Sequence, residues 1–182
     1  MSLLVVKDLK QHFPVRGGVL MRAVASCKAV DGVSFELGKG ETVGLVGESG
    51  CGKTTLGKAI VRLLKPTDGK IVFDGSDITH EGIGALRPIR RNMQMIFQDP
   101  AESLNPRHTV RDILEEPFIV QKIGSRDERR KWVAELLDKV GLSATAADRF
   151  PFEFSGGQRP RHWRGRGAGL KPRAIVCAEP LR

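Results

Sequence analysis

The sequence predicts an α/β fold, and three features lead to this prediction. The apolar run ETVGLVG passes directly into the glycine-rich turn GESGCGKTT at residues 47–55, and the helical pattern KTTLGKAIVRLL follows. NMQMIFQD is expected as a core strand, and RAIVCAE is a β-branched run of the kind found in buried parallel strands. Two amphipathic patterns lie between these runs in the sequence and predict helices.

The elements around the glycine-rich turn begin with a predicted antiparallel flap. SLLVVKDL and GVSFEL have the short β-branched runs of strands, and the turn-rich stretch RGGVLMRAVASCKAVDG lies between them. ETVGLVG is then expected as a buried strand. The helix after the turn is predicted from apolar residues at helical spacing, which are Leu56, Ala59, Ile60, Leu63 and Leu64.

The rest of the chain alternates strand and helix signals. KPTDGKIVFDG is expected as a turn, a strand and a second turn, because Pro66 suits an early turn position and Gly69 a late one. NMQMIFQD, TVRDILEEPF, RDERRKWVAELLDKVG and RAIVCAE then predict a strand, two helices and a strand. We therefore expect a helical insert between two parts of an α/β core.

Composition limits the class of protein. With 182 residues, 40% hydrophobic and 28% charged, the chain is predicted to form one folded globular domain. It lacks a membrane-spanning apolar run and a leader, so we expect it neither to span a membrane nor to be exported.

Its three cysteines are expected as reduced thiols. Seven basic residues and one acidic residue at 159–182 supply +6 of the net charge of +9, and no aromatic stacking pattern accompanies them, so no nucleic-acid role is expected.

The glycine-rich turn matches the phosphate-loop pattern G-x-x-x-x-G-K-[ST] over residues 47–54. Glycines let successive backbone N–H groups curl around a phosphate, the next helix points its positive end there, and Lys53 reaches the outer phosphates. Thr54 is expected to ligate Mg²⁺. The alternative is a glycine turn that only happens to precede a lysine. The predicted phosphate-binding residues are Gly47, Glu48, Ser49, Gly50, Cys51, Gly52, Lys53, Thr54 and Thr55.

Two further motifs narrow the kind of phosphate-binding protein. Gln98, at the end of the predicted strand NMQMIFQD, carries an amide that can contact a metal-bound water. FSGGQ places Ser155 and Gln158 at the S-x-x-Q spacing of a capping box, which predicts a helix start able to receive a second anion. A solvated glutamine and a merely capped helix are the alternatives for these two motifs.

Together these residues resemble the nucleotide-binding subunit of ABC transporters. GESGCGKTT matches the phosphate loop of that family, Gln98 its Q-loop, FSGGQ its signature and AIVCAEP its second Walker strand, in the family's order. HFPVRGG, QDPAESLNPR and HTVRDILEEP are similar to the oligopeptide and dipeptide importers, a branch that carries peptides or nickel into bacteria. The resemblance covers residues 3–179.

The resemblance implies a P-loop NTPase core of ABC type with an antiparallel β flap and a helical insert, truncated at its C-terminal end. Residues 1–182 are then a single, incomplete nucleotide-binding domain, in which 1–98 and 170–182 form the ATP-binding core and 99–155 the helical signalling insert. The implied partners are a second nucleotide-binding subunit, in a head-to-tail dimer, and transmembrane permease subunits. The implied place is the cytoplasmic face of the bacterial plasma membrane, with peripheral attachment through the permease.

The resemblance also implies roles for single residues. ATP and Mg²⁺ lie between the phosphate loop of one subunit and the signature of the other. Phe13 takes the adenine-stacking position, and the alternative for it is a core aromatic residue. Gln98 contacts the metal and senses the γ-phosphate, and Glu179 aligns with the general base. The signature residues are Ser155, Gly156, Gly157 and Gln158.

The chain departs from the family after the signature. In QRPRHWRGRGAGL, Pro160 costs a helix about 3 kcal/mol and each of three glycines about 1 kcal/mol, so a short or frayed helix is predicted. Ala178 stands where the family has the aspartate that holds Mg²⁺. The chain ends before the family's D-loop and switch histidine. Weak nucleotide binding and little or no hydrolysis are therefore expected.

The leading prediction is an ATP-binding subunit of a peptide-type ABC importer with impaired ATPase activity. One alternative is a non-catalytic nucleotide-binding module, a pseudo-ATPase, that regulates by occupying a dimer. Another is a nucleic-acid contact through the basic C-terminal region. A misread reading frame across residues 160–169 and an inactive paralogue are two explanations for the altered composition there.

Overall fold

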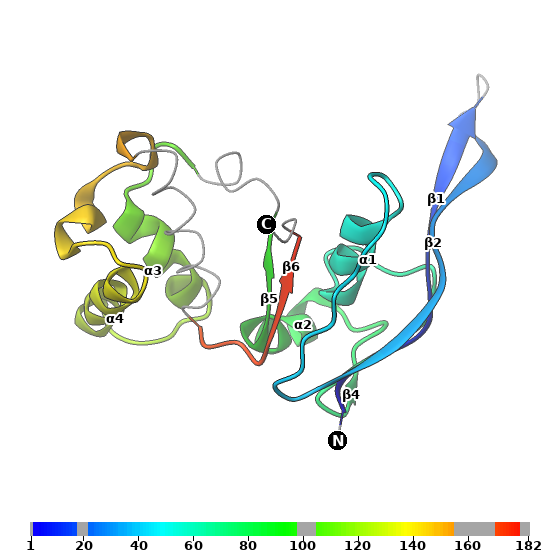
Figure 1. Cartoon of the computed structure of the whole chain (residues 1–182), viewed down its shortest axis with the longest axis horizontal. Coiled ribbons are helices and arrows are strands. Elements are labelled where there is room, and N and C mark those ends of the chain that lie inside the picture. The colour runs from blue at the N-terminus through cyan, green and yellow to red at the C-terminus, as the bar shows by residue number, and fades with distance from the viewer. Residues whose placement is uncertain (1, 18–21, 98–104, 155–169, 179–182) are drawn as a thin grey trace. The chain divides into compact units, whose positions relative to one another are not determined.

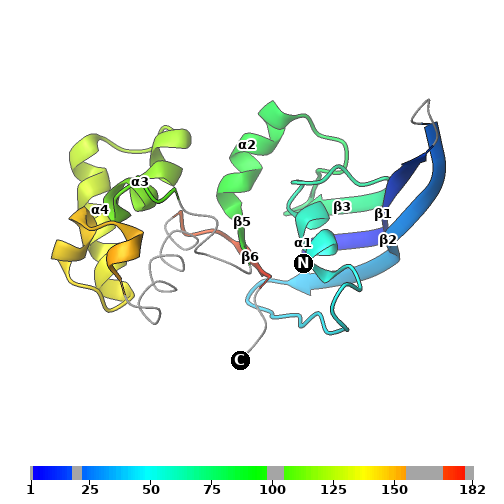
Figure 2. The ribbon, with the colours of Figure 1, turned by 90° about the horizontal axis from the view of Figure 1, so that it is seen from above.

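The computed structural model describes residues 2–17, 22–97, 105–154 and 170–178. The chain divides into two compact units, Met1–Leu86 and Arg87–Arg182, whose elements are labelled in Figures 1 and 2. No helix among the described residues is long and apolar enough to cross a membrane. The finer division into a core of residues 1–98 and 170–182 and an insert of residues 99–155 stays a prediction.

An antiparallel sheet dominates the first unit. Its strands are β1 (Ser2–Gly17), β2 (Arg22–Gly38), β3 (Asp68–Phe73) and β4 (Ser76–Asp77), in the order β2-β1-β3-β4. The predicted flap is confirmed, but the stretch expected to be turn-rich is strand on both sides of residues 18–21. Continuous cross-strand pairing, with irregularities of register along the way, holds these glycine- and polar-rich residues extended.

Helix α1 (Lys53–Ile60) belongs to the same unit and contacts β1 and β2. The helix is shorter than predicted, because Arg62 adopts a left-handed conformation with φ of 57° and ends it. The buried Arg62 side chain then donates hydrogen bonds to three backbone carbonyls, at 2.9 Å to Ile78, 3.2 Å to Leu64 and 3.2 Å to Glu81. Leu63 lies beyond the helix and is 48% exposed.

The prediction that ETVGLVG forms a buried strand is wrong for this structure. Residues 41–47 carry no strand, and the side chains of Val43, Leu45 and Val46 are 50%, 52% and 91% exposed. A β-branched run becomes a strand only where a neighbouring strand bonds its N–H and C=O groups. Among the described residues, no strand pairs with this segment.

The second unit contains a small parallel sheet of β5 (Met93–Ile96) and β6 (Ala174–Cys177). Both predicted strands are confirmed, although Ile175 is 46% exposed, so β6 is not buried on both faces. Helix α2 (Ile83–Asn92), which leads from the first unit into β5, was not predicted. Its sequence, with Pro88 inside it and few apolar residues, gives a weak helical signal.

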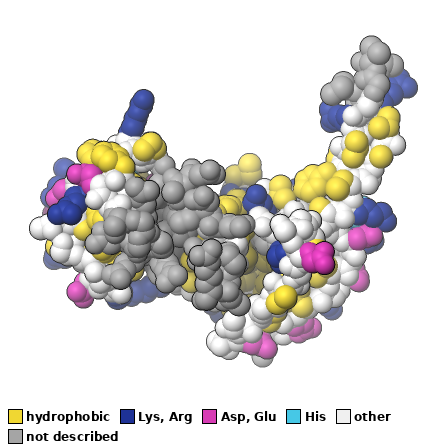
Figure 3. All heavy atoms as spheres, turned by 45° about the horizontal axis from the view of Figure 1, so that its top comes forward, with side chains coloured by type: hydrophobic (Ala, Val, Ile, Leu, Met, Phe, Trp, Pro, Cys, Tyr) yellow, Lys and Arg dark blue, Asp and Glu magenta, His cyan; other side chains and the backbone are white. Residues whose placement is uncertain are grey.

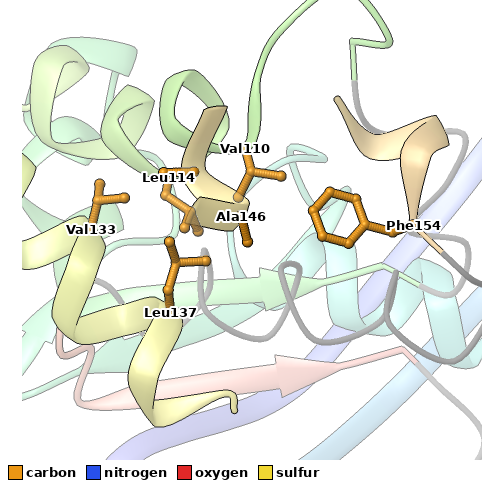
Figure 4. Close-up of a cluster of buried hydrophobic side chains, with 7 residues drawn as sticks. Val110, Leu114, Val133, Leu137, Ala146 and Phe154 are labelled. Atoms are coloured by element: carbon orange, nitrogen blue, oxygen red, sulfur yellow. The ribbon is translucent and has the colours of Figure 1, made fainter. Parts of the chain in front are cut away.

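Two helices form the main core of the second unit. These are α3 (Val110–Val120) and α4 (Arg126–Lys139), followed by the short 3₁₀ helices η1 (Ala144–Asp148) and η2 (Pro151–Glu153). Both predicted helices are confirmed, and each begins with a capping box, at Thr109 and at Ser125. Figure 4 shows the buried side chains that converge between them, and the whole cluster is Val110, Leu114, Val133, Leu137, Ala146, Ala147 and Phe154.

Candidate functional site

The glycine-rich turn is curled rather than extended. The Cys51 backbone N–H donates to the Glu48 carbonyl at 3.3 Å, and Gly50 and Gly52 have φ values of 84° and 96°. Such φ values are open to glycine and strained for other residues. Helix α1 begins directly after Gly52, so the turn delivers the chain into a helix start as the pattern predicts.

The start of α1 offers an anion a positive helix end. No side chain caps it, and its first turn contains no acidic residue. The backbone N–H groups of a first helical turn lack partners within the helix, and the helix dipole adds partial positive charge there. The residues present therefore fit a phosphate, and the exposed Thr54 hydroxyl at this helix start fits a metal ligand.

Lys53 places its ammonium group inside the curl of the turn. Its Nζ donates to the carbonyl oxygens of Gly47 at 2.7 Å and Glu48 at 2.5 Å, and it lies 3.5 Å from Cys51 Sγ. These contacts fold the lysine back over the loop. A phosphate that enters the curl would exchange the two carbonyl acceptors of Lys53 for charged oxygens, which are stronger acceptors.

Strand β2 supports the end of the turn. A Cβ atom on Gly52 would come 2.1 Å from the carbonyl oxygen of Ala29, so the two backbones are in direct contact. Gly50 differs, since a Cβ atom on it would meet nothing within 4 Å. Gly52 is therefore needed both for its φ and for its close approach to β2, whereas Gly50 is needed for its φ alone.

Phe13 lies on β1 of the same unit, opposite Cys27 of β2. Its side chain is 37% exposed, which disfavours the alternative of a core aromatic residue. Beside it, His12 Nε2 lies 2.9 Å from a carboxylate oxygen of Asp31, and Lys28 Nζ lies 3.1 Å from the other. Hydrogen bonds from His12 and Lys28 hold the pKa of Asp31 below its usual value. This charged group ties the two strands together next to Phe13.

The remaining predicted site residues are only partly placed by the structure. Nine of them form the one loop 47–55, whereas Gln98, residues 155–158 and Glu179 lie outside the described residues, as does the helix predicted after the signature. Ala178 follows β6 directly, and its backbone N–H donates to the Ile96 carbonyl at 2.8 Å. The residue that follows this strand therefore carries a methyl group and no carboxylate.

Two features of the site were not predicted from the sequence. The contact between Gly52 and Ala29 joins residues 23 positions apart, and only the fold brings them together. The proximity of Cys51 to Lys53 could have been expected from their spacing, since the loop must turn sharply between them. The role of β2 in holding the loop had no local sequence signal.

The comparison with protein families decides the assignment of this loop. The pattern of the family described as "ABC transporter" matches residues 30–181, which is most of the chain. The chain belongs to the ABC transporter family.

Related proteins and solved structures agree with this ABC assignment. The chain is 50% identical over 181 residues to "Oligopeptide transport ATP-binding protein AppF" of Bacillus subtilis, covering 99% of this chain and 55% of that protein. It is 46% identical to "Glutathione import ATP-binding protein GsiA" of Pectobacterium atrosepticum, covering 98% of this chain and 29% of the other. The chain thus spans about half the length of AppF and less than a third of the length of GsiA.

Among solved structures, the chain is similar to the dimer of the ATP-binding cassette MJ0796 bound to ADP and Pi. The TM-score is 0.82 at 28% identity, with 96% of this chain and 72% of the other covered. A structure of cbiO1 from Clostridium perfringens gives a TM-score of 0.76 at 24% identity, with 97% and 64% covered. The predicted fold class, an ABC-type P-loop NTPase of α/β type, is confirmed.

Proposed function

We propose that this chain is the ATP-binding subunit of a peptide-type ABC importer, which couples ATP binding and hydrolysis to transmembrane transport. The observation that carries the proposal is the curled loop 47–52, closed by Lys53 and leading into an uncapped helix start. Its likeness to AppF supports the peptide branch, because AppF is named as an oligopeptide transport ATP-binding protein.

Within this proposal the loop residues hold the phosphates of ATP, and Phe13 stacks on the adenine. Backbone N–H groups of residues 47–55 surround the phosphates, and Lys53 neutralises their outer charge. Thr54 and Gln98 would hold Mg²⁺, which supplies charge neutralisation to the β- and γ-phosphates when bound. Residues 155–158 of a second subunit and Glu179 complete the site in a head-to-tail dimer. The structure of MJ0796, which is dimeric, supports assembly of two subunits.

We further propose that ATP hydrolysis by this chain is impaired. Ala178 provides no carboxylate at the end of β6, and a missing acidic ligand weakens the hold on a divalent cation. This favours the second candidate function, a non-catalytic nucleotide-binding module. Both candidates attach to the membrane through permease subunits, on the cytoplasmic face, and neither requires nucleic acid.

A binding and turnover experiment tests these proposals in sequence. A fluorescent ATP analogue is titrated into the purified chain with and without Mg²⁺, and phosphate release is then measured with ATP. The Lys53→Ala variant should lose at least about tenfold in affinity, which corresponds to one charge-assisted hydrogen bond of about 1.4 kcal/mol or more. The control is Lys65→Ala, an exposed lysine outside the loop, whose affinity should not change.

Three outcomes separate the candidates. Binding that depends on Lys53 without phosphate release favours the non-catalytic module, and turnover that rises with protein concentration favours an active dimeric ATPase. Absence of binding, or equal loss in the Lys53→Ala and Lys65→Ala variants, would contradict both. The Ala178→Asp variant should tighten Mg²⁺-dependent binding without restoring full turnover.

A further inference from the structure

The outer part of the β1–β2 hairpin is a two-stranded ribbon that reaches beyond the rest of its sheet. Strand β3 pairs with β1 only from Leu4 to Lys10, so from Gln11 onward β1 pairs with β2 alone. Figure 1 shows this ribbon extending away from α1 and β4. Isolated two-stranded ribbons are at best marginally stable in water. We refer to residues 14–17 and 22–26 as the outer ribbon.

One face of the outer ribbon carries exposed apolar side chains. Val15 pairs with Ala25, so these two side chains leave the same face. Val24 lies on that face too, because a Cβ atom on Gly17, two residues after Val15, would come 2.9 Å from Val24 Cγ2. The exposed fractions are 46% for Val15 and 66% for Val24.

The charge of the outer ribbon is wholly positive. From Phe13 to Lys28 the sequence contains Arg16, Arg22 and Lys28 and no aspartate or glutamate. Lys28 is engaged with Asp31, whereas Arg16 and Arg22 are exposed and form no ion pair within the described residues. Figure 3 shows hydrophobic and Lys or Arg side chains side by side along the projecting hairpin.

We propose that the outer ribbon binds the surface of an anionic phospholipid bilayer directly. Val15 and Val24 enter the boundary between headgroups and acyl chains, and Arg22, which pairs with Gly17 on the same face, contacts lipid phosphates. Arg16, on the opposite face, adds longer-range attraction to the anionic surface. Binding of this kind combines buried apolar area with attraction between cations and anionic lipids. An acidic polypeptide would pair the arginines but leave the valines exposed to water, so the bilayer fits both observations. This contact requires no permease subunit.

Vesicle sedimentation tests the proposal with the full chain and no other protein. Partitioning is measured on vesicles of phosphatidylcholine alone and on equimolar phosphatidylcholine and phosphatidylglycerol. The chain should bind the anionic vesicles and hardly bind the neutral ones, and 0.5 M salt should release it, at about a 4 Å screening length. Removing one cation near such a surface weakens partitioning roughly fivefold, so Arg16→Gln with Arg22→Gln should weaken it about 25-fold.

The apolar contribution is tested by a second pair of variants. Val15→Ser with Val24→Ser should weaken partitioning on anionic vesicles roughly tenfold, because two partly buried valines no longer enter the bilayer. The single variant Val24→Ser, expected to lose roughly threefold, serves if the double variant fails to fold by circular dichroism.

Matched controls separate the ribbon from the net charge of the chain. Arg126→Gln with Arg130→Gln removes two exposed arginines of α4, and Ile119→Ser with Val120→Ser removes two exposed apolar side chains of α3. Both control pairs should retain partitioning within about threefold. Equal losses in ribbon and control variants, or equal binding to neutral and anionic vesicles, would overturn the proposal. So would polyglutamate that displaces the chain from vesicles while the valine variants bind normally, since that result identifies an acidic polypeptide as the partner.

Discussion

Gly50 and Gly52 lie two residues apart in the phosphate loop and have similar positive φ values, yet their surroundings predict different costs for the same substitution. In Gly50→Ala the new methyl group meets nothing within 4 Å, so only the left-handed conformation is penalised, by about 1–2 kcal/mol. In Gly52→Ala the methyl carbon would lie 2.1 Å from the Ala29 carbonyl oxygen. Backbone atoms cannot rotate away, and overpacking of this kind adds about 1–3 kcal/mol or more.

The two variants are compared by thermal unfolding and by titration with a fluorescent ATP analogue. At about 3 °C per kcal/mol, Gly50→Ala should lower Tm by about 3–6 °C and Gly52→Ala by about 6–15 °C. If the loop instead moves off β2 to make room, the Tm of Gly52→Ala falls less but its affinity for the analogue falls further than that of Gly50→Ala. Equal values for both variants in both assays would refute the contact between the loop and Ala29. Gly75→Ala, at φ of 82° with open surroundings and outside the loop, is the control for the conformational cost.

The remaining predictions concern stability away from the loop. Hydrogen bonds from Thr79 lower the pKa of Asp77 to about 2, so the stabilisation by this carboxylate is present above pH 3.8 and is lost as pH falls through 2. In urea titrations at pH 7, Asp77→Asn should lower the free energy of unfolding by less than about 1 kcal/mol, because the carboxylate is half exposed. Below pH 2 the same substitution should have no measurable effect. Ser125→Ala removes the side-chain cap of α4 and should cost about 1 kcal/mol in urea unfolding, whereas Ser143→Ala, which makes no cap hydrogen bond, should cost less than half of that. Arg62→Met deletes three hydrogen bonds from a buried guanidinium to carbonyls and should cost about 2–4 kcal/mol, and a loss under 1 kcal/mol would contradict a clamping role.

Local signals in the sequence predicted the elements whose stability is itself local. Thr109 with Asp112, and Ser125 with Glu128, form the capping boxes that start α3 and α4, and the apolar spacing of both helices matches their buried faces. The loop 47–55 was likewise predictable, because glycine conformations and a helix start determine its curl.

Elements that depend on a distant partner were predicted less well. ETVGLVG has strong strand propensity, yet residues 41–47 find no ladder partner among the described residues and remain exposed. The opposite error occurred in the flap, where pairing between β1 and β2 overrides the turn propensity of residues such as Gly17. In both cases the state of a segment depends on hydrogen bonds to another strand, which periodicity does not report.

Strand β2, which pairs with β1, also contacts the phosphate loop in the proposed nucleotide site. Phe13, the proposed base-stacking residue, lies opposite Cys27, and the phosphate loop contacts the same strand at Ala29, two residues further on. Two residues of strand span roughly 6–7 Å, so a short segment of β2 fixes the distance along the strand between Phe13 and the end of the phosphate loop. The hydrogen bond between His12 of β1 and Asp31 of β2 opposes slippage of the two strands at this level. The residues before the loop form no strand, yet the end of the loop is held against the flap by the contact between Gly52 and Ala29. This contact therefore determines the position of the loop relative to Phe13.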